Sequence, residues 1–279
     1  MKLAVALVAL STLAIPSRAS GQTAEPDPTP PAGSPTSAPL QAPAPSPVSP
    51  PSPAVARPVS WKLMVPNLIH DQARIWSFPA RLGQGHRWLP AAVVLGTTAA
   101  LVALDPVEAA YFRRARTFHG FNNIFTANAT AIGTLAAPVS LYAIGLIRRD
   151  SKMHRTALLA GEAVGDSEVL TTVFKDTTRR IRPAGVPPGG DYSDTWFQSG
   201  GSLIRGSGSF PSGHTIAAFS VATVFARRYG NHRWVPYAAY GMAALVGFSR
   251  LSLSSHFLSD VFMGGALGYS ISRFTVLRQ

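Results

Sequence analysis

The chain has 279 residues, of which 46% are hydrophobic, and this is enough for one domain with a substantial core. It carries 25 Lys and Arg against 13 Asp and Glu, so its formal net charge is +12 and anionic partners are favoured. No cysteine is present, which excludes disulfides, zinc–thiolate sites and thiol catalysis.

The N-terminal residues have the pattern of an export signal. Met1-Lys2 is a short basic start, and residues 3–15 form an apolar run of 13 residues. Ser17 and Ala19 follow at the spacing that a signal peptidase recognises. The apolar run is too short to be a good membrane span. We therefore predict that residues 1–19 are a signal peptide, with an uncleaved anchor as the alternative. Either one directs the chain to the cell envelope.

Proline dominates the next segment. Residues 23–58 contain 13 prolines among 36 residues, and the rest are mostly Ala, Ser and Thr. Such a segment cannot form a ladder of backbone hydrogen bonds or bury apolar area. The composition predicts a disordered linker over residues 20–58, serving either as a spacer from a membrane or wall or as a dispensable tail. The folded domain is then expected over residues 59–279.

Apolar runs of helical length occupy most of that domain, with little alternation of period two. The candidate helices are 61–80, 89–104, 124–147, 156–175 and the runs that start at His214, Trp234 and His256. This pattern predicts an all-α fold, a bundle of about six helices. Only 124–147 is long enough for a clear membrane span, which needs about 20 apolar residues. An integral membrane protein and a soluble one both remain open, and we favour a periplasmic domain, either free or membrane-associated.

Cationic residues and a helix start interrupt the apolar pattern. Lys175 and Arg182 are seven residues apart, so they share a face if the helix persists as far as Pro183. Two such cations are more often a solvated surface than a site. The segment Pro211 to His214 then opens the next apolar run. Helix N-termini present unpaired N–H groups and the positive end of the helix dipole, and small residues let an anion approach them.

A histidine and a carboxylate follow Arg250. Ser254 and Ser255 can cap the next helix, which would put His256 in its first turn. Asp260 comes four residues later on the same face, where it can accept the proton of one imidazole nitrogen and leave the other free to attack. A lone His–Asp pair is more often structural than catalytic. Three cations, two histidines, one carboxylate and a helix N-terminus together suit a bound phosphate.

These motifs and their spacings resemble the three-part signature of the type 2 phosphatidic acid phosphatase (PAP2) and vanadium haloperoxidase superfamily. The signature residues are Lys175 with six residues before Arg182-Pro183, then Pro211 to His214, then Ser249-Arg250 with five residues before His256 and three more before Asp260. The match covers residues 175–260 directly and the helical domain from about 60 to 279 by extension.

The resemblance implies a metal-independent phosphatase. In it His256 would form a phosphohistidine, Asp260 would orient His256, and His214 would protonate the leaving oxygen. The phosphate-binding residues would be Lys175, Arg182, Ser212, Gly213 and Arg250. One histidine would start neutral and His214 would start protonated near neutral pH. The substrate would be a phosphorylated small molecule or a lipid (di)phosphate rather than a nucleic acid. No cofactor is expected, and vanadate should inhibit.

Two alternatives remain at this point. The first is a vanadate-dependent haloperoxidase, in which vanadate would be the cofactor in the phosphate pocket and His256 its ligand. The second is a non-catalytic envelope protein that binds anionic headgroups. Eight basic residues outside the motifs are expected at the end of the bundle opposite the motifs; they are Arg148, Arg149, Lys152, Arg155, Arg227, Arg228, Arg233 and Arg273.

Overall fold

The computed structural model describes residues 57–85, 88–198 and 206–278. The predicted signal peptide and all of the predicted linker except Arg57 and Pro58 lie outside the described residues, so both stay predictions. Arg57 already contacts the folded domain, because its Nη1 donates a hydrogen bond to Asp71 at 2.6 Å.

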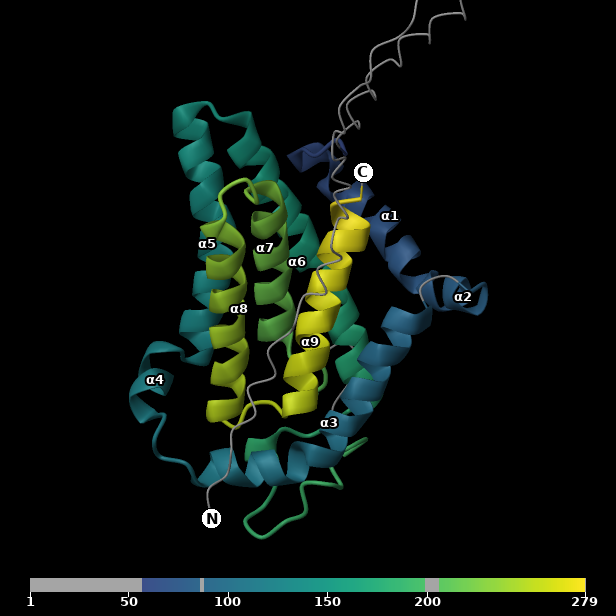
Figure 1. Ribbon diagram of the computed structural model, residues 1–279, viewed down its shortest axis with the longest axis vertical. Coiled ribbons are helices and arrows are strands. Elements are labelled where there is room, and N and C mark those ends of the chain that lie inside the picture. The colour runs from purple at the N-terminus through teal and green to yellow at the C-terminus, as the bar shows by residue number, and fades with distance from the viewer. Residues whose placement is uncertain (1–56, 86–87, 199–205, 279) are drawn as a thin grey trace, which may run out of the picture. The chain divides into compact units, whose positions relative to one another are not determined.

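The described residues form helices and no strand (Figure 1). The helices are η1 (Trp61–Leu63), α1 (Met64–Trp76), α2 (Phe78–Gly83), α3 (Trp88–Arg114), α4 (His119–Ile124), α5 (Ala127–Arg148), α6 (Ser151–Thr178), η2 (Pro183–Gly185), α7 (Gly213–Arg228), α8 (Trp234–Ser252), α9 (Leu258–Ile271) and the π-helical turn η3 (Ser272–Val276). The longest are α3, α5, α6, α7, α8 and α9, and they make up the bundle. The predicted all-α bundle of about six helices is confirmed.

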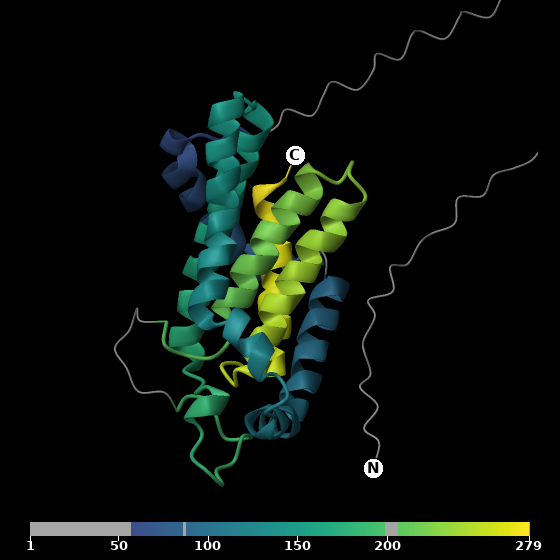
Figure 2. The same ribbon diagram turned by 90° about the vertical axis from the view of Figure 1, so that its left-hand side faces the viewer.

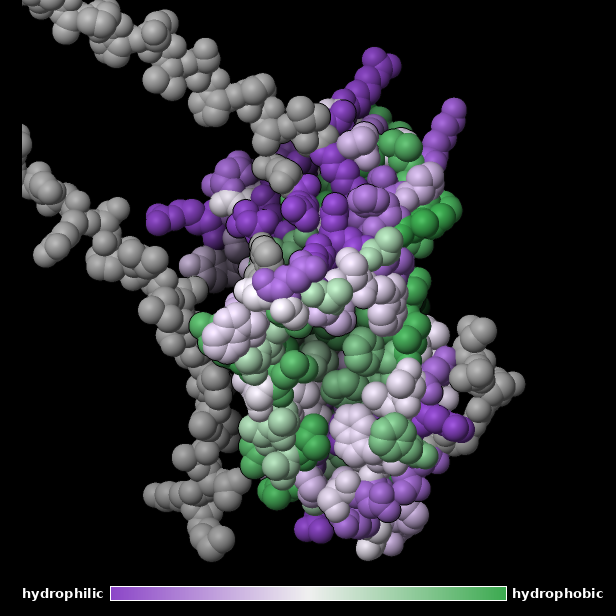
Figure 3. Space-filling view, turned by 90° about the vertical axis from the view of Figure 1, so that its right-hand side faces the viewer, coloured by the Kyte–Doolittle hydropathy of each residue, from purple (hydrophilic) through white to green (hydrophobic). Residues whose placement is uncertain are grey.

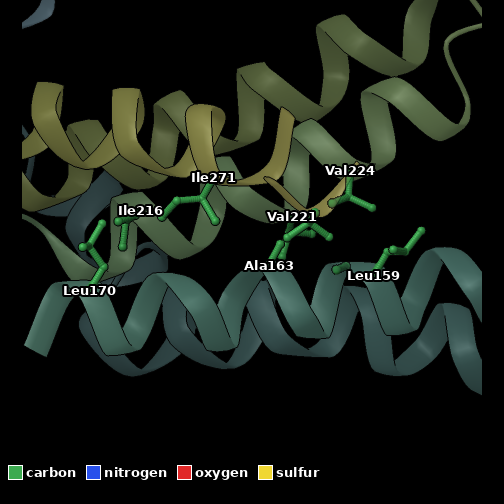
Figure 4. Close-up of a cluster of buried hydrophobic side chains, with 9 residues drawn as sticks. Leu159, Ala163, Leu170, Ile216, Val221, Val224 and Ile271 are labelled. Atoms are coloured by element: carbon green, nitrogen blue, oxygen red, sulfur yellow. The ribbon is translucent and has the colours of Figure 1, made fainter. Parts of the chain in front are cut away.

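Helix α7 lies at the centre of the bundle and contacts α5, α6, α8 and α9. Its apolar side chains pack against those of α6 and α9, as Figure 4 shows for Leu170, Ile216 and Ile271. Gly264 of α9 faces the start of α7, where a Cβ atom would lie 2.9 Å from the carbonyl oxygen of Ser212. The absence of a side chain there lets the start of α7 and the middle of α9 approach closely.

The helices α6 and α7 run in opposite directions. At one end the Nε of Arg228 donates to the Oγ1 of Thr156 at 3.2 Å, and at the other end Gly213 lies beside Lys175. The described parts of the connection from α6 to α7 (residues 179–198 and 206–212) and the turn from α8 to α9 lie together at this second end (Figures 1 and 2). The eight basic residues expected opposite the motifs belong to the termini of α5 to α8 and to η3 at the first end, as predicted.

Helix α3 is longer than the sequence suggested. It continues through Asp105, Pro106 and Glu108 to Arg114, whereas we expected an apolar run that ends at residue 104. Asp105 does not end the helix because its carboxylate is fully buried and paired with Arg180. The described residues therefore contain two helices long and apolar enough to cross a membrane, α3 and α5, rather than one.

Candidate active site

His256 lies in the turn between α8 and α9. Its Nδ1 is 3.5 Å from the Oδ2 of Asp260 and 3.3 Å from the Oγ of Ser209. The predicted His–Asp pair is therefore brought together, and both contacts use Nδ1 rather than Nε2 of the imidazole. The predicted serine cap is wrong, however. Helix α9 begins at Leu258, and Asp260 itself accepts the N–H of the N-cap residue Phe257 at 3.0 Å.

Burial controls the protonation of His256. The residue is 2% exposed and Asp260 is fully buried. Burial lowers the pKa of His256, and the carboxylate of Asp260 partly opposes this change by stabilising the imidazolium. The nearby cations Arg182 and Lys175 act in the same direction as burial. A pKa lowered from its ordinary value leaves His256 mainly neutral near pH 7.

His214 is the second residue of α7, which begins at Gly213, so the predicted helix start within Pro211 to His214 is confirmed. Ser212 is the N-cap residue, without a capping hydrogen bond from its side chain. Its Nε2 lies 3.0 Å from the carbonyl oxygen of Ala127. Burial, assisted by the charge of Arg250, lowers the pKa of His214 to about 4. The expectation that His214 starts protonated is thus wrong for the free protein. A phosphate anion bound beside it would favour the imidazolium, because an opposite charge stabilises the charged form.

Lys175 and Arg182 reach the site from different backbone segments. Helix α6 ends at Thr178, and Arg179 follows in the left-handed conformation with φ 45°. The expected shared helical face is therefore wrong, and it is not Pro183 that ends the helix. A methyl group on Gly213 would lie 3.4 Å from the Nζ of Lys175, so the space beside the ammonium depends on a glycine. The Arg182 charge acts on both Lys175 and His256.

Arg250 and Ser212 complete the predicted set. The Nη2 of Arg250 donates to the carbonyl oxygen of Phe125 at 3.0 Å and to the Oγ of Ser249 at 2.7 Å. The N–H of Ser212 donates to the carbonyl oxygen of Asp260 at 3.0 Å, which ties the start of α7 to α9. Since this N–H is used, Ser212 can offer a phosphate only its hydroxyl group, whereas the first N–H groups of α7 point toward the site end.

Three buried residues at the site were missed by the sequence analysis. The Oγ of Ser209 donates to Asp260, and Arg180 bridges Asp260 and Asp105. Asp105 offered a signal, because a carboxylate inside an otherwise apolar run is rarely buried without a partner. Ser209 and Arg180 offered none beyond their closeness to the motifs. Among the residues that the structure describes, no group of three or more His, Asp or Glu is arranged to hold a metal ion.

Comparison with known proteins supports the resemblance that the motifs indicated, over the C-terminal part of the chain. Residues 156–279 match the family model of the PAP2 superfamily. This segment belongs to that superfamily, as its motifs predicted. The PAP2 segment includes every predicted site residue, while Asp105 and helices α1 to α5 lie outside it.

Three curated proteins are similar to the chain. Lipid A 1-phosphatase of Porphyromonas gingivalis is 38% identical over 85 residues, which are 30% of this chain and 18% of that protein. Lipid A 4'-phosphatase of the same organism is 30% identical over 38% of this chain and 43% of its own length. Phosphatidylglycerophosphatase B of Bacillus subtilis is 33% identical over 37% of this chain and 48% of its own length. The matched part thus spans less than half the length of each of these relatives.

One solved structure is also similar. It is the crystal structure of a transmembrane PAP2-type phosphatidylglycerolphosphate phosphatase from Bacillus subtilis, with 23% identity and a TM-score of 0.47. The likeness covers 66% of this chain and 92% of that one.

Proposed function

We propose that the chain is a metal-independent phosphatase that hydrolyses the phosphate ester of a membrane lipid through a phosphohistidine at His256. The observation that carries this proposal is the arrangement at one end of the bundle. There the buried His256–Asp260 pair lies in the field of Lys175 and Arg182, close to the N-terminus of α7.

In the first step, the phosphate binds at the start of α7, beside Gly213 and Lys175. The cations and the free N–H groups there neutralise the charge of its oxygens, which is the main demand of phosphoryl transfer. The Nε2 of His256 attacks phosphorus in line and the phosphorus–oxygen bond to the leaving group breaks. His214 gives a proton to the departing oxygen, and the lipid leaves as an alcohol.

In the second step, a water molecule attacks the phosphorus of the phosphohistidine. His214, now neutral, takes a proton from that water, and the bond between phosphorus and His256 breaks. Inorganic phosphate leaves, and both histidines return to their starting states. Asp260 stabilises the positive charge that His256 carries while it is bonded to phosphorus.

The surface of the bundle supports a location in the membrane. In α3 and α5, only 11% and 17% of the most apolar window is buried, although a core helix of a water-soluble protein would be mostly covered. The exposed large hydrophobic residues on these helices are Trp88, Leu89, Val93, Leu95, Leu104, Val107, Tyr111, Ile132, Leu135, Val139, Ile144, Leu146 and Ile147. Figure 3 shows a hydrophobic band between two hydrophilic ends. Lipid covering α3 and α5 accounts for this surface.

The curated relatives support a lipid substrate, because their names describe phosphatases of lipid A and of phosphatidylglycerophosphate. Together with the predicted export signal and the apolar surface, they favour an enzyme of the cell envelope that acts on lipids beside it.

The purified full chain in detergent tests this proposal. We expect it to release inorganic phosphate from phosphatidic acid in mixed micelles, and more slowly from soluble glycerol phosphate. The His256→Ala variant, purified in parallel, controls for a contaminating phosphatase. No release from either substrate would contradict the phosphatase activity. Equal kcat/KM for both would contradict only the lipid preference.

Vanadate and a chelator test the metal-independent chemistry. We expect vanadate to inhibit competitively, since it adopts the geometry of the transferring phosphoryl group, and EDTA to leave the rate unchanged. Activity that disappears with EDTA and returns with a divalent ion would show that a metal takes part. Bromination in the presence of vanadate and peroxide, without phosphate release, would favour the haloperoxidase alternative instead.

A further inference from the structure

Arg180 is a buried arginine that the proposed chemistry does not use. It lies two residues beyond the end of α6 and is 1% exposed. Its Nη1 donates to the Oδ1 of Asp260 at 2.7 Å and to the Oγ of Ser259 at 2.8 Å. Its Nη2 donates to the Oδ2 of Asp105 at 2.7 Å. One guanidinium therefore joins two buried carboxylates.

Asp105 brings helix α3 into this arrangement. Its Oδ1 accepts the N–H of Ser259 at 3.0 Å, and its Oδ2 accepts the hydroxyl of Ser259 at 2.5 Å as well as Arg180. The first turn of α9 is thereby attached to α3, which lies outside the PAP2 segment. Because Asp260 belongs to the same turn, the position of its backbone depends on Asp105.

Arg180 affects both oxygens of the Asp260 carboxylate, Oδ1 directly and Oδ2 through Ser209. Arg180 holds Oδ1, and this leaves Oδ2 for Phe257, Ser209 and His256. The carbonyl oxygen of Arg180 also accepts the N–H of Ser209 at 2.7 Å, so the main chain of Arg180 places the serine that donates to Oδ2. Of the two other groups that donate to Oδ2, Ser209 is therefore bonded to the main chain of Arg180, and the N–H of Phe257 lies at the start of α9, which Asp105 attaches to α3.

The guanidinium is itself held in place. Its Cζ lies 3.9 Å from the ring centre of Phe257 and 4.3 Å from that of Trp196. Its Nε donates to the Oγ1 of Thr195 at 3.2 Å. A planar guanidinium in contact with two aromatic rings can donate hydrogen bonds to two carboxylates in a fixed geometry, whereas a lysine ammonium on a flexible side chain cannot.

We propose that Arg180, anchored by Asp105, is a positioning residue for the phosphoryl transfer proposed above. It fixes the carboxylate of Asp260, and through it the imidazole of His256, so that Nε2 points at phosphorus. The inference rests on the proposed function, but it assigns to Arg180 and Asp105 a task beyond attaching α3 to α9. A residue that only supported the fold would affect stability without acting through Asp260.

A double-mutant cycle between Arg180 and Asp260 separates these roles. The full chain is compared with Arg180→Met, Arg180→Lys, Asp260→Asn and the double variant Arg180→Met/Asp260→Asn. Arg227→Met is the matched control, because Arg227 is an exposed arginine in the last turn of α7, at the far end from His256. For each protein we measure kcat, KM and the affinity for vanadate.

We expect Arg180→Met to lower kcat by about 10²-fold, since a misplaced catalytic group costs about this much. KM should stay within about threefold, because the phosphate cradle is intact, whereas the affinity for vanadate should fall with kcat, because vanadate mimics the transition state that His256 attacks. Arg180→Lys should recover part of the loss. The double variant should be no more than about threefold slower than Asp260→Asn, since residues that act as a unit are not additive.

Equal kcat values for Arg180→Met and Arg227→Met would overturn the inference. It would also be overturned if Arg180→Met lowered kcat by the same factor in the Asp260→Asn protein as in the unaltered protein. If Arg180→Met does not fold, Asp105→Asn replaces it in the double-mutant cycle. Asp105→Asn is expected to lower kcat by about tenfold in the unaltered protein and to have no further effect in the Asp260→Asn protein. Failure of the proposed function is seen separately, because it would leave the unaltered chain without phosphatase activity.

Discussion

Replacing His256 by alanine is expected to abolish turnover while the helical bundle stays folded. His256 is the only histidine of the motifs whose Nδ1 is held by a carboxylate, so it alone is prepared to attack. Loss of a nucleophile costs on the order of 10⁴–10⁶-fold in kcat. His256 lies in a turn between helices rather than in the hydrophobic core, so the helical content should remain. Phosphate release and far-ultraviolet circular dichroism measure the two outcomes.

The matched control is His232→Ala, because His232 is exposed at the opposite end of the bundle. It should have the kcat of the unaltered protein. An acid-labile phosphate on His256, trapped after rapid mixing with labelled substrate and located by mass spectrometry, would support the covalent step directly. A His256→Ala protein with a near-normal rate would refute the mechanism, since that mechanism depends on attack by the imidazole of His256.

The site residues of the motifs were predictable because each lies at a short, fixed spacing from its neighbours. The start of α7 at Gly213 and the closeness of His256 to Asp260 follow from spacing and from local backbone geometry. Arg180, by contrast, stands among other arginines in the sequence, where nothing indicates which one is buried. Its role depends on Asp105, which is 75 residues away in the chain. Contacts at that separation come from tertiary packing.

The predicted boundaries of two helices, α3 and α9, were wrong for a related reason. The sequence rules place helix ends at capping serines, prolines and the first charged residue after an apolar run. At α9 the cap is the side chain of Asp260, and at α3 the charge of Asp105 is satisfied by Arg180. Both are cases in which a residue that normally marks a boundary has a tertiary partner. The same tertiary contacts also position the residues of the site, so rules based on local sequence gave wrong helix ends next to the site.

His214→Ala is expected to harm the hydrolysis of a poor leaving group far more than that of a good one. An alkoxide needs a proton as its bond to phosphorus breaks, whereas p-nitrophenolate leaves readily without one. General acid catalysis is typically worth about 10²–10⁴-fold, so this factor should be lost with an alkyl phosphate and largely kept with p-nitrophenyl phosphate. His256→Ala should be equally inactive with both substrates.

The low pKa of His214 adds a pH dependence to this expectation. With a pKa of about 4, free His214 is neutral at pH 7, so the proton must enter with the substrate or be taken up once the phosphate is bound. A phosphate monoester loses its second proton near pH 6, so kcat/KM for an alkyl phosphate should fall as the pH rises above about 6. Measuring kcat/KM from acid to alkaline pH for both substrates, in the unaltered protein and in His214→Ala, tests the assignment. The same fractional loss for both leaving groups would mean that His214 binds the phosphate and donates no proton.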